Sequence, residues 1–386
     1  MAKRVGVTAM FNLSSGGGIK RVTVDLINTL NELGREVYLL TPFKPDYKKI
    51  RELYGNMKVN KVYYLPKWKQ RFCKGELFSR ILMKNDFIKM SKEVDFIIDL
   101  DGGVFHKYLP KDFNKNNYIV WRLCCTKPQE TDWTRKNLWK KLKNKVRVYL
   151  SKNKENRPSI NYKLYAIDKW TSDELIKYWN LKPEEMCLYP PIQVKELLYK
   201  GQKKKNQIVI FGRLAPEKRI EESIRVFAKG TKAFPEYNLV IFGATTVDSK
   251  RYISYLRKLI KELGIDNRTK IIISPPFREL KKLLLESRII IDSENDISLT
   301  ITSLEAMAAG NLVLTSKNSG NYIDVLDNGK YGYGFDNVED GAEKLDEILR
   351  NIKKIDTKKS IKRTEFFSQE NFKRRLIKII NGSRYL

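Results

Sequence analysis

Two cations are placed where they could bind an anion. Arg213 and Lys218 lie five residues apart in the segment GRLAPEKR, directly after the apolar run IVIFG. The arginine fork and the lysine ammonium, held at the end of a strand, suit a diphosphate leaving group. Cations near the start of a helix are otherwise unfavourable beside its dipole, and a bound anion removes that conflict. The pattern therefore predicts a diphosphate site, the alternative being ordinary solvated surface charge.

A candidate carboxylate stands in the segment DISLTITSLEAMAAG, which runs from Asp296 to Gly310. Glu305 follows Thr302 by three residues, and this spacing predicts a capping box that opens an apolar helix. An ionised carboxylate only accepts hydrogen bonds, so Glu305 is also suited to hold two ribose hydroxyls. The residues alone leave both interpretations open.

A glycine-rich loop precedes the first predicted helix. Gly16, Gly17 and Gly18 follow the run VGVTAMF and open the stretch RVTVDLINTLNELG. Glycines let the backbone approach a ligand closely, and the N–H groups at a helix start favour phosphate. The spacing is neither GxGxxG nor a Walker loop, so a tight strand-to-helix turn is an equal alternative.

The elements that must position these residues alternate between strand and helix. The predicted strands are VGVTAMF, EVYLLTP, KVYYLP, DFIIDLD and YIVWRLCC, then IVIFG, NLVIFG, KIIIS, IIIDS and LVLTS. The helices predicted in the second half span residues 217–229, 249–263, 277–285 and 302–309. Such alternation, occurring twice, predicts an α/β fold of two doubly wound Rossmann-like domains joined near residues 195–205 and facing a cleft. Ligands of such sheets bind beyond the carboxyl ends of the strands.

Bulk composition sets further limits. The 386 residues fit two domains, and 42% hydrophobic residues are enough for two cores. The sequence contains no run of about 18 apolar residues, so no transmembrane helix is predicted. The N-terminus is predicted to form a strand rather than a signal peptide. The four cysteines lack CxxC spacing, which favours a reducing cytoplasm over disulfides or structural zinc.

The net charge of +30 predicts a polyanionic partner, the alternative being a lysine-rich solvated surface. Between Trp133 and Lys163 there are 11 Lys or Arg residues against one acid, Glu155. Apolar residues share one face of this segment, which predicts a basic amphipathic helix that docks on an anionic membrane. Its predicted membrane-binding residues are Trp139, Lys140, Lys141, Lys143, Lys145 and Arg147. Residues 68–89 repeat the pattern more weakly, and packing of both apolar faces on the protein's own core is the alternative.

In order and spacing, the second half resembles the donor-binding domain of GT-B retaining glycosyltransferases of the GT4 (group 1) family. The segments that carry the resemblance are GRLAPEK, NLVIFGA, SPPFRELKKLLLESRIIIDS and SLEAMAAGNLVLTSKNSG. The first half agrees more loosely, through the GGG loop, YAIDKWTSDELIKYW and YPPI, and FFSQENFKRRLIKII resembles the family's last helix. The resemblance implies an acceptor domain over 1–195, a donor domain over 196–365, and a C-terminal helix over 366–386 that packs back toward the first domain.

Site roles follow from the resemblance residue by residue. Arg213 and Lys218 would bind the donor diphosphate, Gly17 and Gly18 would approach its phosphates, and Glu305 matches the second Glu of the family's E-x7-E motif, a ribose ligand. Asn318-Ser319-Gly320 matches a small-residue turn of the family.

The sequence departs from the family at two places. Ile297 stands where the first Glu of E-x7-E is expected, and Asp296, one position earlier, is the favoured replacement beside the transferred sugar, with Glu294 also near. The family's usual His after a first-half strand is replaced by Cys124 and Cys125. The only histidine, His106, follows the neighbouring strand and is the second predicted catalytic residue.

Asp99-Leu100-Asp101 forms a DxD pattern, which in another glycosyltransferase fold binds a metal with the nucleotide. Because Arg and Lys neutralise the leaving group in the resembled family, no metal and no cofactor are expected. The two aspartates are predicted either to contact the acceptor or, as the favoured alternative, to cap strand ends.

The resulting hypothesis is a retaining glycosyltransferase that moves a sugar from a nucleoside-diphosphate sugar to a lipid-linked or membrane-proximal glycan acceptor. We expect the protein to lie in the cytoplasm, bound peripherally to the cytoplasmic face of the membrane. Nucleic acid is not an expected partner. The alternatives are a GT-B sugar-nucleotide epimerase, a basic nucleic-acid-binding protein, and a degenerate relative that binds sugars without transferring them.

Overall fold

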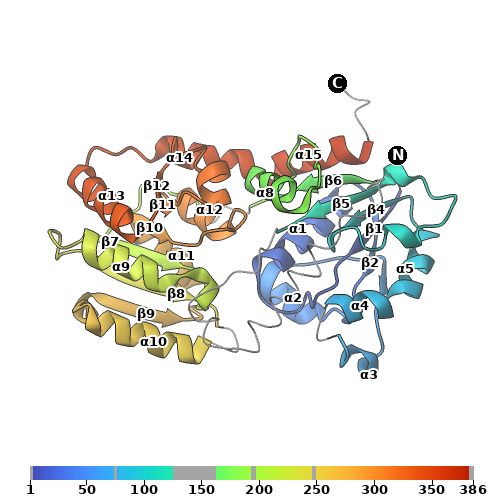
Figure 1. The fold of residues 1–386 in the computed structure, drawn as a ribbon, viewed down its shortest axis with the longest axis horizontal. Coiled ribbons are helices and arrows are strands. Elements are labelled where there is room, and N and C mark those ends of the chain that lie inside the picture. Colours follow the sequence, from blue (N-terminus) through green and yellow to red (C-terminus); the bar gives the residue numbers. More distant parts are fainter. Residues whose placement is uncertain (1–2, 74–75, 125–161, 193–196, 246–248, 382–386) are drawn as a thin grey trace. The chain divides into compact units, whose positions relative to one another are not determined.

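The computed structural model describes residues 3–73, 76–124, 162–192, 197–245 and 249–381 (Figure 1). These residues fall into two compact units. The first contains the described residues up to 124, with 162–191 and 369–381, and the second contains those from Ile192 to Ser368. The chain thus changes unit after Pro191 and after Ser368, a few residues from the boundaries predicted at 195 and 365.

The first unit is built on a six-stranded sheet in which all neighbouring strands are parallel. Its order is β3-β2-β1-β4-β5-β6. The strands are β1 (Arg4–Thr8), β2 (Glu36–Leu40), β3 (Lys61–Tyr63), β4 (Phe96–Asp99), β5 (Tyr118–Arg122) and β6 (Lys163–Ala166). The helices are α1 (Gly18–Glu32), α2 (Tyr47–Tyr54), α3 (Lys67–Gln70), α4 (Glu76–Leu82), α5 (Lys84–Ser91), α8 (Lys169–Trp179) and α15 (Gln369–Asn381).

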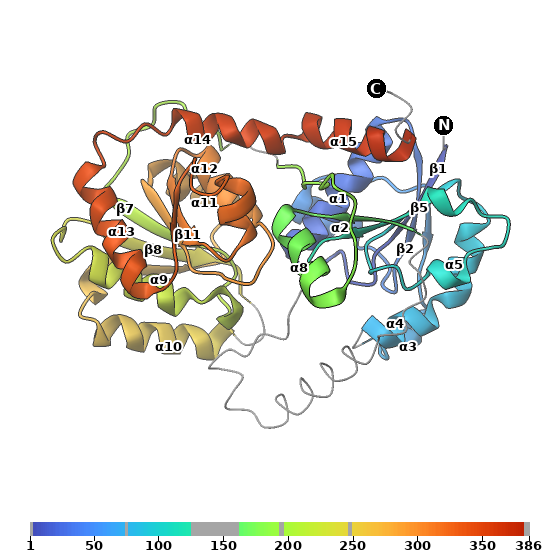
Figure 2. The same cartoon turned by 45° about the horizontal axis from the view of Figure 1, so that its top comes forward.

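The last described helix belongs to this first unit. The ring of Phe372 on α15 stacks on Trp121 of β5 with 5.6 Å between ring centroids. Gln369 Nε2 donates a 2.6 Å hydrogen bond to Thr29 Oγ1 on α1, and Figure 2 shows the two helices beside each other. Because Phe372 and Trp121 are fully buried, α15 completes the core of a sheet that is otherwise built from residues more than 180 positions earlier.

The second unit repeats the design with a second parallel sheet, of order β12-β11-β10-β7-β8-β9. The strands are β7 (Gln207–Phe211), β8 (Asn238–Gly243), β9 (Thr269–Ile273), β10 (Ile289–Asp292), β11 (Leu312–Ser316) and β12 (Tyr333–Phe335). The helices are α9 (Ile220–Gly230), α10 (Ser249–Glu262), α11 (Phe277–Glu286), α12 (Ile301–Ala308), α13 (Val338–Asn351) and α14 (Lys358–Arg363). The fold prediction of two doubly wound α/β domains is confirmed.

The sequence explains why these strands are central. Ile289, Ile290 and Ile291 of β10 are all fully buried, as expected of strands covered on both faces by helices. On one face, α9 and α13 pack so closely that a Cβ added to Gly230 would lie 2.7 Å from the carbonyl oxygen of Ala342. Only glycine permits this approach, which brings α9 directly against α13.

Each sheet has one topological switch point, where successive crossovers turn to opposite sides. In the first unit it lies between β1 and β4, and in the second between β7 and β10. Loops that leave the carboxyl ends of these strands diverge and leave room for a ligand. The chemistry of each unit is therefore to be sought in the loops after β1 and β4, and after β7 and β10.

The loop after β7 is held by a close contact between two glycines. Gly212 follows β7, and its N–H donates a 3.2 Å hydrogen bond to the carbonyl oxygen of Phe242. A Cβ built on Gly243, the residue after Phe242, would lie 1.5 Å from the carbonyl oxygen of Gly212. No side chain fits there, so the course of the chain toward Arg213 depends on Gly243.

We expect Gly243→Ala to lower the free energy of unfolding of the second unit by about 3 kcal/mol or more, because backbone must move to admit the methyl group. Gly264→Ala is the matched control: its φ is also positive, at 65°, but nothing lies within 4 Å of its added Cβ. The control should lose only about 1 kcal/mol through backbone strain. Urea denaturation followed by far-UV circular dichroism measures both, and equal losses would contradict the steric explanation.

Candidate functional site

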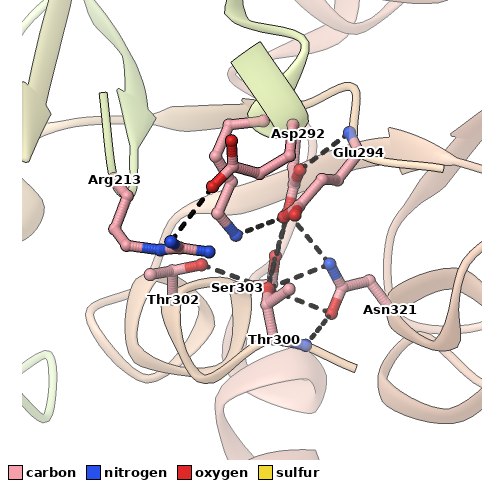
Figure 3. A network of polar contacts seen from close by, with 9 residues as sticks. Arg213, Asp292, Glu294, Thr300, Thr302, Ser303 and Asn321 are labelled. Atoms are coloured by element: carbon pink, nitrogen blue, oxygen red, sulfur yellow. Dashed lines mark hydrogen bonds and ion pairs between the residues drawn. The ribbon is translucent and has the colours of Figure 1, made fainter. Parts of the chain in front are cut away.

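The site in the second unit is formed by the two loops at its switch point. One loop, residues 212–219, follows β7 and contains the one-turn helix η3 (Pro216–Lys218). The other, residues 293–300, follows β10 and leads into α12. Arg219 Nη1 donates a 3.1 Å hydrogen bond to Asn295 Oδ1, and the ammonium of Lys218 contacts the carboxylate of Glu294. Two loops far apart in sequence thus form one polar cluster, part of which is drawn in Figure 3.

The contact between Lys218 and Glu294 is buried. The Lys218 side chain is 15% exposed and that of Glu294 is 2% exposed. Burial raises the pKa of Glu294 to about 7, and the nearby Asp292 carboxylate adds to this while the Lys218 ammonium opposes it. A carboxyl group that titrates near neutrality beside an ammonium is common at functional sites.

Arg213, the other predicted diphosphate ligand, lies in a different environment. Its guanidinium makes a 3.0 Å ion pair with Glu217 in the same loop, and both side chains are nearly half exposed. Exposed pairs of this kind contribute little and exchange readily. In the view of Figure 3 the Arg213 guanidinium points toward Thr302, which lies in the first turn of α12.

Behind these cations, the carboxylate of Asp292 is the centre of a hydrogen-bonded network. Its Oδ2 accepts from Asn321 Nδ2 at 2.9 Å and from Ser303 Oγ at 3.0 Å, and its Oδ1 accepts from the Glu294 N–H at 3.1 Å. Asn321 Oδ1 in turn accepts from the Thr300 N–H at 2.7 Å. The network fixes the loop after β10 and the start of α12 to one another.

The sequence-based interpretation of Thr302 and Glu305 as a capping box is wrong. The N-cap of α12 is Thr300, and the helix begins at Ile301, so Thr302 already lies inside its first turn. The Thr300 side chain makes no hydrogen bond to the helix backbone; its Oγ1 contacts Ser303 Oγ at 3.3 Å instead. Glu305 therefore stands beyond the reach of a capping position, buried within α12.

Asp296 faces the neighbouring turn. It adopts a left-handed backbone conformation with φ of 51°, its N–H donates to the Asn318 carbonyl at 2.8 Å, and its Oδ1 accepts from Asn318 Nδ2 at 2.9 Å. The next residue, Ile297, forms a parallel bridge with Ser319. The structure therefore brings Lys218 together with Glu294, whereas Asp296 and its loop are held against the turn at 318–320. A catalytic role for Asp296 stays a prediction.

Gly17 and Gly18 lie in the first unit, at the start of α1. Gly17 is the N-cap, with φ of 139°, and no side chain caps the helix. The loop before it is anchored by Tyr54, whose hydroxyl donates a 2.6 Å hydrogen bond to the Ser15 carbonyl. The first turn of α1 contains no acid. Such a helix start, at the carboxyl end of a parallel strand, is suited to an anion.

The switch point of the first unit holds the DxD aspartates. Thr8 Oγ1 donates to Asp101 Oδ2 at 2.7 Å and contacts Asp99 Oδ1 at 3.1 Å. Asp101 Oδ1 also accepts from the Met10 N–H at 2.9 Å, and the Tyr118 hydroxyl donates to Asp99. The two carboxylates thus tie the carboxyl ends of β1 and β4 to each other and to the start of β5, as the strand-capping alternative expects.

Burial raises the pKa of both aspartates. For Asp101 the value reaches about 7, with the charge of Asp99 as the second cause. His106 lies close by on the one-turn helix η1 (His106–Tyr108), with its ring 5.4 Å from the Tyr118 ring and 5.1 Å from the Tyr162 ring. Tyr118 thus contacts both the His106 ring and the Asp99 carboxylate.

Several predicted residues are not part of these clusters. Trp139, Lys140, Lys141, Lys143, Lys145 and Arg147, and also Cys125, lie outside the described residues. Among the residues that are described, no helix is long and apolar enough to span a membrane, and no three His, Cys, Asp or Glu side chains gather as metal ligands. Metal-free activity stays a prediction.

Sequence reasoning missed Asp292, Asn321 and the role of Thr300. One signal was available, because Asp292 ends the run IIID just as Asp99 ends the run FIID. A polar residue that closes an apolar strand in a parallel sheet points into the region where ligands bind. Asn321 gave no such signal, since its contact with Asp292 spans 29 residues.

Known structures share this architecture. A glycosyltransferase from Rickettsia africae superposes with a TM-score of 0.72 at 14% identity, covering 98% of this chain and 97% of that one. Anabaena HepE, solved in complex with UDP-glucose, gives a TM-score of 0.67 at 13% identity, covering 98% and 99%. At these identities the comparison shows the fold, which is the GT-B fold of glycosyltransferases.

Sequence comparison finds its matches mainly in the second unit. Residues 199–364, most of the second unit, match the family described as glycosyl transferases group 1. Over 194 residues the chain is 30% identical to the GDP-Man:Man(3)GlcNAc(2)-PP-Dol alpha-1,2-mannosyltransferase of Xenopus laevis. The aligned region covers 47% of this chain and 40% of that protein. The chain spans less than half the length of the curated relatives it matches.

The buried carboxyl pair Asp99 and Asp101 should make the stability of the first unit depend on pH. In an unfolded chain Asp101 would titrate near 3.9, whereas in the folded protein its pKa is about 7. The folded state therefore holds the proton more tightly, so its contribution to stability is present below about pH 4 and lost as pH rises through about 7. Asp101→Asn should reduce the fall in stability between pH 5 and pH 8 by about 1–3 kcal/mol.

Urea denaturation followed by tryptophan fluorescence measures this when Trp133 and Trp139, which lie outside the described residues, are changed to Phe in every variant. The four remaining tryptophans, Trp68, Trp121, Trp170 and Trp179, lie in the first unit. Asp112→Asn, at an exposed position, is the control and should keep the wild-type pH dependence. An unchanged pH dependence in Asp101→Asn would show that Asp101 does not titrate in this range.

Proposed function

We propose that this protein is a glycosyltransferase that transfers a hexose from a nucleoside-diphosphate sugar to a lipid-linked or membrane-proximal glycan. The observation that carries the proposal is the meeting of Arg213, Lys218 and the start of α12 at the switch point of a group 1 glycosyltransferase domain. An arginine, a lysine and a helix N-terminus each supply positive potential and hydrogen-bond donors to one diphosphate.

In this mechanism the second unit stabilises the leaving group. As the bond between the sugar and the diphosphate breaks, negative charge develops on the bridging phosphate oxygen. Arg213 and Lys218 would stabilise that charge from fixed positions, and the network around Asp292 would keep the start of α12 in place. Glu305 would hold the ribose hydroxyls. Most of the acceleration would come from positioning and from this charge stabilisation.

Three finer features belong to the proposal. Retention of anomeric configuration follows the family that the sequence resembles and is read from the proton NMR spectrum of the product. Two sugar donors are candidates, GDP-mannose and UDP-glucose, because one relative is named for GDP-Man and HepE was solved with UDP-glucose. A thermal-shift comparison of GDP-mannose with UDP-glucose separates them. The acceptor chemistry is suggested by the relative's name, which specifies a dolichol diphosphate glycan.

Arg213→Ala and Lys218→Ala should each reduce sugar transfer by roughly 100-fold or more, because each removes one donor to the developing charge. Lys229→Ala is a matched control on the same unit, since Lys229 on α9 makes an exposed ion pair with Glu339 on α13. The measurement is the initial rate of release of GDP or UDP with a lipid-linked acceptor. Wild-type rates in both site variants would refute the assignment of the diphosphate site.

An aromatic and basic surface on the first unit supports docking at a membrane. Trp68 is 62% exposed on α3 and Phe72, just after that helix, is 61% exposed. Lys69 Nζ lies 5.1 Å from the centre of the Trp68 ring, and Lys67 and Arg71 are on the same short segment. Aromatic side chains insert at the level of lipid headgroups, and each nearby cation adds about 1 kcal/mol with anionic lipid. We infer that this surface holds the protein peripherally on an anionic membrane, on its cytoplasmic face.

Trp68→Ser combined with Phe72→Ser should reduce co-sedimentation with phosphatidylglycerol vesicles several-fold. Ile176→Ser, which alters a comparably exposed apolar residue on α8, should leave it unchanged. Reversing the charges of Lys140, Lys141, Lys143, Lys145 and Arg147 tests the second predicted membrane segment in the same assay. Equal binding of wild-type protein to phosphatidylglycerol and phosphatidylcholine vesicles would exclude an electrostatic docking surface.

A further inference from the structure

Each of the two cations of the diphosphate site already has a carboxylate partner. Arg213 pairs with Glu217 at 3.0 Å, and both side chains are nearly half exposed. Lys218 pairs with Glu294, and both side chains are largely buried. Water can replace Glu217 at little cost when Arg213 turns to a ligand. Glu294 has no such freedom, because it would keep its charge at 2% exposure after losing its ammonium.

The surroundings of Glu294 decide how that charge is accommodated. Lys218 from the loop after β7 faces it directly, and the positive charge of Arg213 from the same loop also acts on it. From β10, Asp292 brings a second negative charge, and its Oδ1 accepts a hydrogen bond from the Glu294 N–H at 3.1 Å. The backbone of Glu294 is thereby fixed near Lys218, and the carboxylate cannot follow its loop out into water without breaking the network.

An anion that binds Lys218 therefore competes with Glu294 for one ammonium. A diphosphate at this position adds negative charge beside two carboxylates that are already close together. Like charges in a buried site cannot all stay ionised, and the group that most easily accepts a proton does so. Glu294 is that group, because burial already brings its pKa to about 7 before any anion arrives.

We propose that Glu294 is the resident counter-ion of Lys218, that the diphosphate of the sugar donor displaces it, and that Glu294 takes up a proton from solvent as it is displaced. The inference rests on the proposed function and concerns the regulation of the same site. The proton balance closes over a cycle: one O–H bond forms on Glu294 when the donor binds, and that proton returns to solvent when the diphosphate product leaves.

This exchange has a consequence for donor affinity. Because the bound state holds the proton more tightly than the free state, donor binding is favoured at low pH and weakens as pH rises above the pKa of free Glu294, about 7. The steepest possible slope is a tenfold loss of affinity for each pH unit. In the free enzyme Glu294 balances the charge of Lys218 and holds its side chain in place. The Lys218 ammonium is therefore available in one orientation when a diphosphate arrives.

Isothermal titration calorimetry with GDP-mannose and with UDP-glucose measures the exchange directly. Both phosphates of a nucleotide sugar are esterified, so the ligand lacks the phosphomonoester proton that titrates near pH 6. At pH 7.5 the binding enthalpy of the wild type should differ between HEPES and Tris buffers by an amount that corresponds to uptake of up to one proton. In Glu294→Gln, which keeps the shape and an acceptor oxygen for Lys218, this buffer dependence should disappear.

The affinities give an independent second readout. Wild-type affinity should fall up to about tenfold per pH unit between pH 7 and pH 8.5, whereas that of Glu294→Gln should be constant and tighter than wild type at pH 8.5. Glu217→Gln is the matched control, since it removes the exposed carboxylate from Arg213, and it should keep the wild-type proton uptake.

The outcomes separate the two proposals. Absence of binding of either nucleotide sugar to the wild type at any pH between 6 and 8.5 would overturn the proposed function. Binding by the wild type without proton uptake would overturn the role of Glu294 alone, and this test requires no variant to fold. Equal proton uptake in the wild type and in Glu294→Gln would place the proton elsewhere and overturn it as well.

Discussion

The buried contact between Lys218 and Glu294 joins two loops whose residues are 76 positions apart in the sequence. Taking two charges out of water is costly, and the cost is offset only when the geometry is held by surrounding groups. That requirement explains the rest of the site. Gly212 and Gly243 set the path of one loop, and the carboxylate of Asp292 fixes the other. The two strands that lead into these loops, β7 and β10, are adjacent at the centre of the sheet.

The first unit places different chemistry at the equivalent position of its sheet. There the loops after β1 and β4 are joined by two buried carboxylates, the hydroxyl of Thr8 and the phenol of Tyr118. Hydroxyl and carboxyl groups at a switch point are suited to ligands that are themselves hydroxylated, whereas paired cations are suited to phosphate. One architecture used twice thus provides two chemically distinct sites.

The sequence was informative wherever a property depends on neighbours along the chain. Runs such as IIID and IVIF predicted buried parallel strands, and the helix predicted over 277–285 is observed as α11 (Phe277–Glu286). Prediction failed where a residue's partner comes from a distant loop. Thr302 and Glu305 match a capping box locally, yet α12 starts two residues earlier than that pattern requires, because Thr300 is bound by Asn321 from the loop after β11. The partnership of Lys218 with Glu294 was invisible for the same reason, since it depends on the order of strands in the sheet.

The network around Asp292 also explains why the start of α12 can serve a ligand. Thr300 occupies the N-cap position, where a threonine hydroxyl ordinarily accepts from the first turn of the helix. Its hydroxyl instead takes part in the contacts among Ser303, Asn321 and Asp292. The helix start is thus held rigidly by side chains, while the Thr300 hydroxyl makes no bond to the N–H groups of the first turn. Donors that are fixed before the ligand arrives need no reorganisation when charge develops, and that is the condition under which they lower a transition state most.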